Sequence, residues 1–188
     1  DVYKRQGFYA PTPFVEETEA AGLSRLEPLA DLRAETASTA SLDLGYARGS
    51  WETNLTLFGS NIDDALQLVP VAADRVRLVN VEGATRTRGV EMLGRWRRAP
   101  FVVTASYMYL DADQPDPVGA GRRAAPLTPR HTAGLVAMWE DHDRGRLGFE
   151  AYYTGAQSLD DDPYRARGDA YWELGLLGEV VLGRYRIF

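Results

Sequence analysis

Long runs of alternating apolar and polar residues constrain the fold of this chain more than any other feature of its sequence. After Ser50, for example, Trp51, Leu55 and Leu57 fall on one side of the chain, whereas Glu52 falls on the other. A repeat of two residues is that of a β-strand, whose successive side chains point to opposite faces of the sheet. Comparable runs lie at about 39–46, 89–97, 101–109, 132–140, 146–154 and 171–182. We therefore expect an all-β protein whose strands are apolar on one face only.

The connectors between these runs alternate between short and long. Short turns are expected at 48–50, 98–100, 141–145 and 183–184, and long connections at about 60–85, 111–128 and 157–169. The first long connection contains two apolar runs, 66–69 and 75–79, that could pair as a projecting hairpin. Short turns at one end and long loops at the other are typical of bacterial outer-membrane barrels, which have a polar lumen and an apolar outer face. The pattern predicts an antiparallel meander of about seven to eight strands, a fragment of a large transmembrane β-barrel.

Aromatic residues near the ends of the runs fit this interpretation, because membrane barrels carry aromatic girdles at both interfaces. They are Trp51, Trp96, Tyr107, Tyr109, Trp139, Tyr153 and Trp172. A soluble antiparallel sandwich is also apolar on one face of each sheet. Its strands usually have about 5 to 6 residues, however, whereas these runs span about 10 to 12. The sequence leaves open the alternative of a soluble or surface-displayed β-sandwich that serves as an adhesion or carbohydrate-binding module.

Composition argues against several other classes of function. The formal net charge of -6 disfavours nucleic acid as a partner. Without cysteine there are no disulfides or thiolate metal ligands, and two histidines, His131 and His142, are too few for a histidine-rich metal centre. No apolar run reaches the roughly 18 to 20 residues of a membrane-spanning helix. No serine has a histidine and an aspartate at a recognisable catalytic spacing, so we expect no enzyme.

The chain divides into three regions. Residues 1–6 fit nothing downstream and could be an artefactual tail. Residues 7–36 are rich in proline, alanine and glutamate, and we expect an irregular, extracellular loop segment there. Residues 37–188 hold the alternating runs and are expected to form the partial barrel, ending in a truncated strand at 184–188. Because the chain begins with aspartate and no signal peptide is visible, we expect an internal fragment of a longer protein.

Short groups of residues occur in a characteristic order along the chain. They are Leu32-Arg-Ala-Glu35, Asn61-Ile-Asp-Asp64, Asn80-Val-Glu-Gly-Ala84 with Arg88-Gly-Val-Glu91, Ser106-Tyr-Met-Tyr-Leu110, Pro126-Leu-Thr-Pro-Arg-His131 and Tyr152-Tyr-Thr-Gly155. Together they resemble the C-terminal part of the barrel of TonB-dependent outer-membrane receptors, although Ala34 departs from the proline usual in that family. Each group alone is weakly specific, but their order and spacing over residues 32–188 make the combination fairly specific.

The resemblance implies a barrel of about 22 strands, of which this chain would form roughly a third. It also implies an outer-membrane receptor that takes up a scarce nutrient, most often a ferric siderophore, with energy supplied through TonB. The plug domain and the segment that contacts the TonB complex would lie N-terminal to this chain. Such a receptor would cross the bacterial outer membrane many times, contact its lipid and lipopolysaccharide, and act as a monomer. No cofactor is expected.

Two groups of charged and polar residues are candidates for functional contacts. Glu91, Arg95 and Arg97 share one side of an alternating run, so we expect them to face the lumen and to contact the plug or pair with neighbouring strands. Gly89 in the same run is expected to serve close packing or strand bending. The second group lies in the long connections and comprises Arg122, Arg123, Tyr164 and Arg165. These residues could hold an anionic ferric chelate, although solubility and pairing with nearby aspartates are simpler roles.

Aspartates cluster in two of the long connections, at 111–116 and 160–162. Several carboxylates together could attract a divalent cation, because hard cations prefer oxygen ligands. Neither cluster has the spacing of an EF-hand, and acidic loops are commonly just solvated, so no metal site is predicted. His131 has no cysteine or second histidine in its segment, and we expect a structural role for it.

Overall fold

The computed structural model describes residues 2–9, 26–29, 31–116, 119–141, 143–159, 162, 164–183 and 185–188. These residues form strands, turns and loops, and no helix long and apolar enough to cross a membrane occurs among them. Three residues considered above, His142, Asp160 and Asp161, lie outside the described residues.

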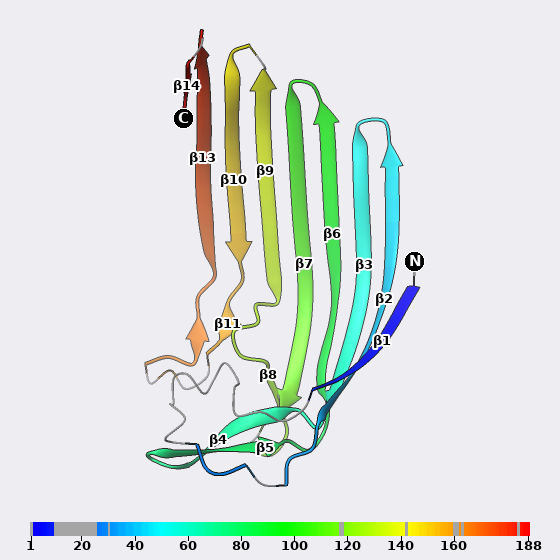
Figure 1. Cartoon of the computed structure of the whole chain (residues 1–188), viewed down its shortest axis with the longest axis vertical. Helices are drawn as coiled ribbons and strands as arrows, with labels where there is room; N and C mark the ends of the chain where they lie inside the picture. Colours follow the sequence, from blue (N-terminus) through cyan, green and yellow to red (C-terminus); the bar gives the residue numbers. More distant parts are fainter. Residues whose placement is uncertain are drawn as a thin grey trace.

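One antiparallel sheet holds most of the described chain (Figure 1). Its seven long strands are β2 (Glu35–Arg48), β3 (Trp51–Asp63), β6 (Thr85–Arg98), β7 (Phe101–Pro115), β9 (His131–Asp141), β10 (Gly145–Thr154) and β13 (Tyr171–Leu182). Each pairs with the next long strand along the chain, so the inner strands satisfy their backbone hydrogen bonds on both sides. The predicted antiparallel meander is therefore confirmed.

Short strands border the sheet at both edges. β14 (Tyr185–Ile187) pairs with β13 and lies within the last strand expected at 184–188. At the other edge, β1 (Val2–Tyr9) pairs with β2, although the sequence suggests a tail and an irregular segment there. A border strand forms its hydrogen bonds with the free backbone groups of its neighbour, so β1 needs little apolar alternation of its own. That residues 1–6 are foreign to the protein stays a prediction.

Connector lengths divide the sheet into a short-turn end and a long-loop end, drawn at the top and bottom of Figure 1. The hairpin expected at 66–79 is present and lies across the long-loop end. The other small strands of this end pair with the tip of β7 or with each other. The small strands are β4 (Leu66–Ala72), β5 (Arg75–Asn80), β8 (Arg122–Ala124), β11 (Gln157–Ser158) and β12 (Arg167–Gly168).

The strand register sorts the side chains onto two faces. Trp51 of β3 lies opposite Trp96 of β6, and two residues of opposite charge, Glu52 and Arg95, lie opposite each other on the other side. We call the side of Trp51 and Trp96 the apolar face and the side of Glu52 and Arg95 the polar face. Because the register continues without a shift through all seven long strands, the two faces extend over the whole sheet.

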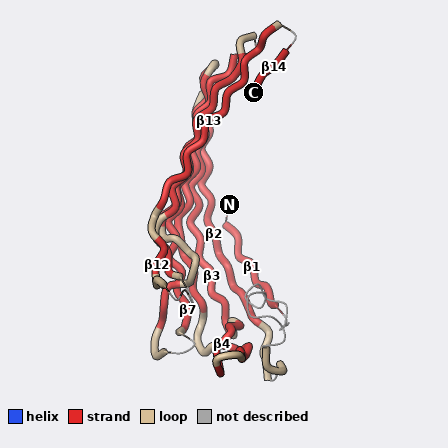
Figure 2. Tube along the Cα trace, turned by 90° about the vertical axis from the view of Figure 1, so that its left-hand side faces the viewer, coloured by secondary structure: helices blue, strands red, loops and turns tan. Residues whose placement is uncertain are grey.

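No second layer covers the apolar face within the described part of the chain. Seen from the side, the long strands form one thin, twisted layer (Figure 2). Large apolar side chains stay in the open, such as Leu174 with 70% of its surface exposed and Leu176 with 82%. A sandwich would bury this face against another sheet. The described residues therefore lack the two-layer architecture of the sandwich alternative, and an open apolar area of this size indicates contact with lipid or a partner.

Aromatic side chains mark both ends of the apolar face. At the short-turn end, the rings of Trp51 and Trp96 are 6.4 Å apart, and near the long-loop end those of Tyr109 and His131 are 5.3 Å apart. Along β7 the two aromatic rows are represented by Phe101 and Tyr109, which are separated by roughly 26 Å at the rise of a β-strand. This separation is close to the height of about 25 Å of the apolar band of membrane barrels.

Candidate functional site

The polar face carries the three charged residues of β6 that the sequence assigns to a lumen. Glu91, Arg95 and Arg97 all lie on this face, as the alternation predicts. Arg95 lies opposite Glu52, with its Nη1 4.0 Å from Oε2 of that residue. Both side chains are exposed, so this ion pair contributes little to stability. Contact of the three residues with a plug stays a prediction.

Gly89 on the polar face of β6 allows an aromatic ring to lie close to the backbone. A Cβ at this position would come within 2.5 Å of Cζ of Phe58 and of the carbonyl oxygen of Tyr109. Phe58 is the register partner of Gly89 on β3, and its ring fills the space that a side chain would need. An aromatic residue that covers a glycine of the neighbouring strand helps to fix the register. The close packing predicted for Gly89 is confirmed.

Glycines also flatten the polar face across β9, β10 and β13. A Cβ at Gly134 would lie 3.3 Å from the ring of Tyr152, so that ring lies over the glycine. The Tyr152 hydroxyl donates to Glu150 at 3.2 Å, and the Glu150 carboxylate in turn lies over Gly175. Two large side chains thus lie along the wall instead of projecting from it, which leaves space on this side of the sheet.

Three of the characteristic residue groups meet where the chain leaves the sheet at the long-loop end. The Asn80 side-chain amide donates to the carbonyl oxygens of Arg33 at 2.9 Å and Asp64 at 2.6 Å, and accepts from the Arg33 N–H at 2.7 Å. Arg33 and Asp64 also form an ion pair at 2.7 Å. In addition, Glu35 accepts the N–H of Leu66 at 2.6 Å. These groups therefore share one structural role, which the sequence does not reveal.

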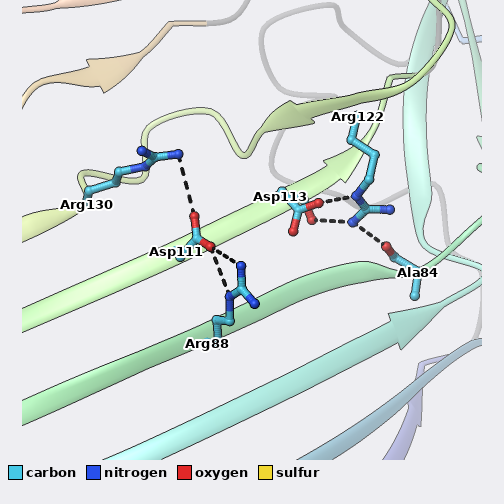
Figure 3. A network of polar contacts seen from close by, with 6 residues as sticks. All are labelled: Ala84, Arg88, Asp111, Asp113, Arg122 and Arg130. Atoms are coloured by element: carbon cyan, nitrogen blue, oxygen red, sulfur yellow. Dashed lines mark hydrogen bonds and ion pairs between the residues drawn. The ribbon is translucent and has the colours of Figure 1, made fainter.

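An arginine–aspartate network lies at the long-loop end of the apolar face (Figure 3). One carboxylate oxygen of Asp111 accepts from Nε and Nη2 of Arg88 at 3.0 and 2.8 Å, and its other oxygen lies 3.6 Å from Nη2 of Arg130. Asp111 is two positions beyond Tyr109 on β7, so it faces the same way as the aromatic row. Two guanidinium groups thus share one carboxylate just beyond the aromatic row.

A second ion pair of the network attaches β8 to β7. Asp113 pairs with Arg122, and Arg122 also donates to the carbonyl oxygen of Ala84 at 2.8 Å (Figure 3). Asp113 is four residues beyond the tyrosine of the aromatic row and so lies outside the apolar band. The hydrogen bond from Arg122 holds the pKa of Asp113 below its ordinary value. The pair therefore orders the start of the connection between β7 and β9.

We expect residues 119–125 of the full-length receptor to exchange their amide hydrogens about two- to fivefold faster, relative to the intrinsic rate, below about pH 4. A carboxyl group with a depressed pKa stabilises the folded form above its unfolded pKa, and this contribution is lost as the pH falls through the folded pKa. Asp113→Asn should give the faster exchange already at neutral pH. Asp143→Asn, at the short-turn end, is the control, and equal exchange in both variants would contradict the expectation.

The structure separates the arginines of β8 that the sequence proposes for substrate binding. Arg122 faces Asp113 on the side of the apolar face, and Arg123 lies opposite Gln114 on the side of the polar face. Arg122 thus has the simpler role considered above, pairing with a nearby aspartate. Arg123 is on the side of the sheet on which a substrate would pass.

The other two candidate substrate residues lie in the connection between β11 and β12. Tyr164 has 93% of its surface exposed, and the N–H groups of Tyr164 and Arg165 both donate to Oδ1 of Asp162, at 2.8 and 3.2 Å. The two long connections that hold the candidates touch through the N–H of Leu127, which donates to the carbonyl oxygen of Ser158 at 2.8 Å. The four residues are therefore at the same end of the sheet but on different connections.

Sequence reasoning missed the pairing of Arg88, Asp111 and Arg130. Arg88 and Arg130 belong to groups noted for their resemblance to a family, and Asp111 to a cluster considered for a cation. The available signal was the phase of the alternation, which puts Arg88 and Asp111 on the apolar side of their strands. A charge on the apolar side at the end of a run indicates the border of the apolar band.

His131 packs against tyrosines of the apolar face. Its Nδ1 lies 2.8 Å from the Tyr107 hydroxyl, and its ring contacts that of Tyr109. In the described part of the chain, no group of three or more histidine, aspartate or glutamate side chains is placed to hold a metal ion.

Solved structures with a similar fold include receptors and transporters. The copper transporter OprC has a TM-score of 0.72 at 14% identity, and covers 97% of this chain with 29% of its own length. The ferric yersiniabactin uptake receptor of Yersinia pestis has a TM-score of 0.68 at 19% identity, and 27% of its length covers 95% of this chain. The ferric-catecholate import receptor of E. coli K12 has a TM-score of 0.66 at 16% identity, and 27% of its length covers 97% of this chain. This chain thus has the fold of a wall segment, less than a third of each receptor.

A family model described as TonB dependent receptor-like, beta-barrel, matches residues 5–187. The chain therefore belongs to the TonB-dependent receptor family, whose members are outer-membrane β-barrels. The resemblance seen in the short residue groups is confirmed. Comparison with curated protein sequences gives no significant match.

Proposed function

We propose that this chain is part of the wall of an outer-membrane receptor that imports a scarce nutrient. The observation that carries the proposal is the one-sided sheet, whose exposed apolar face lies between two aromatic rows and opposite a polar face. Family membership over residues 5–187 supports a role in transport. In this arrangement the long strands cross the outer membrane, the apolar face meets lipid and lipopolysaccharide, and the polar face lines the lumen.

The proposed substrate is a ferric siderophore, and TonB supplies the energy through the part of the receptor that precedes this chain. Two of the similar structures are receptors for ferric chelates, which supports iron, and the third is a copper transporter. In this proposal Arg123, Tyr164 and Arg165 contact the anionic chelate from the long-loop end. The two guanidinium groups are suited to this role, because a guanidinium can form two parallel hydrogen bonds to an anionic group such as a carboxylate. Arg122 contributes mainly through its pair with Asp113.

A plug domain filling the lumen would meet the polar face. In this proposal Glu91, Arg95 and Arg97 make charged contacts with the plug, and the flat wall around Gly134 and Gly175 leaves room for it. The receptor acts as a monomer in this proposal, since a closed barrel has no free sheet edge with which to pair.

We expect the full-length receptor to restore ⁵⁵Fe–siderophore uptake in an iron-starved host that lacks its own siderophore receptors. Uptake should stop when TonB is deleted or a protonophore is added. Arg123→Ala combined with Arg165→Ala should weaken siderophore binding by about tenfold or more, because each charge-assisted hydrogen bond contributes about 1.5–3 kcal/mol. The measurement is equilibrium binding to outer-membrane vesicles.

Arg144→Ala, in a turn at the short-turn end, is the matched control and should bind normally. Radioactive copper serves as the competing substrate. Uptake of copper but not of ferric siderophore would reject the substrate proposal and keep the transport proposal. Recovery of the receptor with soluble protein, away from the outer membrane, would reject both.

A further inference from the structure

A shallow groove on the apolar face runs up to the arginine–aspartate network. Its volume is about 460 Å³, and it is lined on this face by Ala40, Leu42, Leu57, Val90 and Tyr109, with Arg88 at one end. Gly59 lies between Ala40 and Arg88 in the register, so no side chain stands between these two lining residues. The groove is therefore apolar along most of its length and cationic at the end beyond the aromatic row.

The cationic end has more positive than negative charge. Arg88 and Arg130 share the single carboxylate of Asp111, and 79% and 66% of their side-chain surfaces are exposed. At the next pair of facing residues on this side of β6 and β7, Arg86 lies opposite Asp113, which is paired with Arg122. Around Asp111, two guanidinium groups share one carboxylate, which leaves about one unit of positive charge there.

The position of the exposed guanidinium groups relative to the aromatic row indicates which class of ligand the groove would bind. Arg88 is one register step beyond Tyr109 on the same face, roughly 7 Å farther along the strand direction. Because aromatic belts lie at the level of the lipid headgroups, exposed guanidinium groups just beyond the belt stand at the height of headgroup phosphates. A molecule that matches both parts of the site has an acyl chain and a phosphate.

We propose that the groove binds a phosphorylated lipid of the outer leaflet, with an acyl chain along Leu42, Leu57 and Val90 and a headgroup phosphate between Arg88 and Arg130. The two guanidinium groups donate to the phosphate oxygens while Asp111 holds them in place. This inference rests on the proposed location of the strands in an outer membrane. It assigns the lipid contact of the receptor to particular side chains.

The experiment measures the rise in unfolding temperature of the detergent-purified, full-length receptor during titration with diphosphoryl lipid A. Dephosphorylated lipid A and inorganic phosphate are the comparison probes. The double variant Arg88→Gln/Arg130→Gln should weaken the apparent affinity for diphosphoryl lipid A by about tenfold or more. It should leave the weaker binding of dephosphorylated lipid A unchanged. Inorganic phosphate alone should give little or no shift.

Two further variants keep the test decisive. Gly59→Leu fills the groove beside Arg88 and keeps both arginines, since a Cβ there meets only the Thr87 carbonyl oxygen at 3.8 Å, and it should weaken both lipid probes. Arg48→Gln/Arg98→Gln changes the same face at the short-turn end and should bind like the unaltered receptor. Equal losses in both arginine pairs, no loss in either, or equal affinity for the two lipids would overturn the proposal. A receptor that binds the lipid normally but imports no substrate would reject the proposed function alone.

Discussion

Gly89→Val is expected to block or severely weaken assembly of the barrel wall. The new Cβ would lie 2.5 Å from the Phe58 ring and from the carbonyl oxygen of Tyr109, and that oxygen belongs to the backbone of β7. The backbone can move aside only if the pairing of β6 with β7 loosens. We expect a cost of about 3 kcal/mol or more, at or above the upper end of the usual overpacking penalty. The measurement is the fraction of full-length receptor that migrates as folded protein in unheated detergent gels.

Gly45→Val is the matched control for this prediction. Gly45 lies on the polar face of β2, and a Cβ there meets nothing within 4 Å. This variant should fold normally or slightly better, since glycine weakens a strand interior. Adding Phe58→Ala to Gly89→Val should recover only part of the folded fraction, because the clash with the carbonyl oxygen remains. Normal folding of the single Gly89 variant would show that close packing at this strand pair is not limiting.

Leu176→Arg is expected to destabilise the receptor in lipid by about 2–4 kcal/mol, the cost of an arginine near the middle of the apolar band of a membrane barrel. Leu176 is on the apolar face of β13, about midway between Trp172 and Leu182, with 82% of its surface exposed. The substitution removes almost no packing within the protein, so the effect depends on the surrounding lipid. The measurement is guanidinium unfolding of the full-length receptor from lipid vesicles.

The neighbouring residue provides the control. Leu177 is on the polar face and is 51% exposed, so Leu177→Arg should cost less than about 1 kcal/mol in the same vesicles. Equal costs for the two variants would contradict the assignment of the faces. A neutral effect of Leu176→Arg would remove lipid as the partner of the apolar face.

Alternation and connector lengths were enough to predict the meander, because strands have a period of two and each long run has the same two-sided composition. The hairpin at 66–79 and the short last strand were predicted for the same reason. β1 was not predicted, since a border strand depends on hydrogen bonds from its neighbour and not on its own side chains.

The candidate site was predictable only in part. The phase of the alternation placed Glu91, Arg95 and Arg97 on the polar face, which the register confirms. In the long connections the sequence has no alternating run to set this phase, so β8 and the directions of its side chains were not predicted. Arg122 pairs with Asp113 on the apolar-face side, whereas Arg123 lies on the other side, because adjacent residues of a strand point to opposite faces.

By itself, the sequence determined the seven long strands, their two faces and the family, because these depend on local alternation and on short groups of residues. Tertiary structure decided which side chains meet across strands. Only the register brings Arg88, Asp111 and Arg130 together beyond the aromatic row, and only the register places the Phe58 ring over Gly89. Those contacts join residues that are far apart in the chain, and pairing between strands, not the composition of any one strand, sets the distance between them.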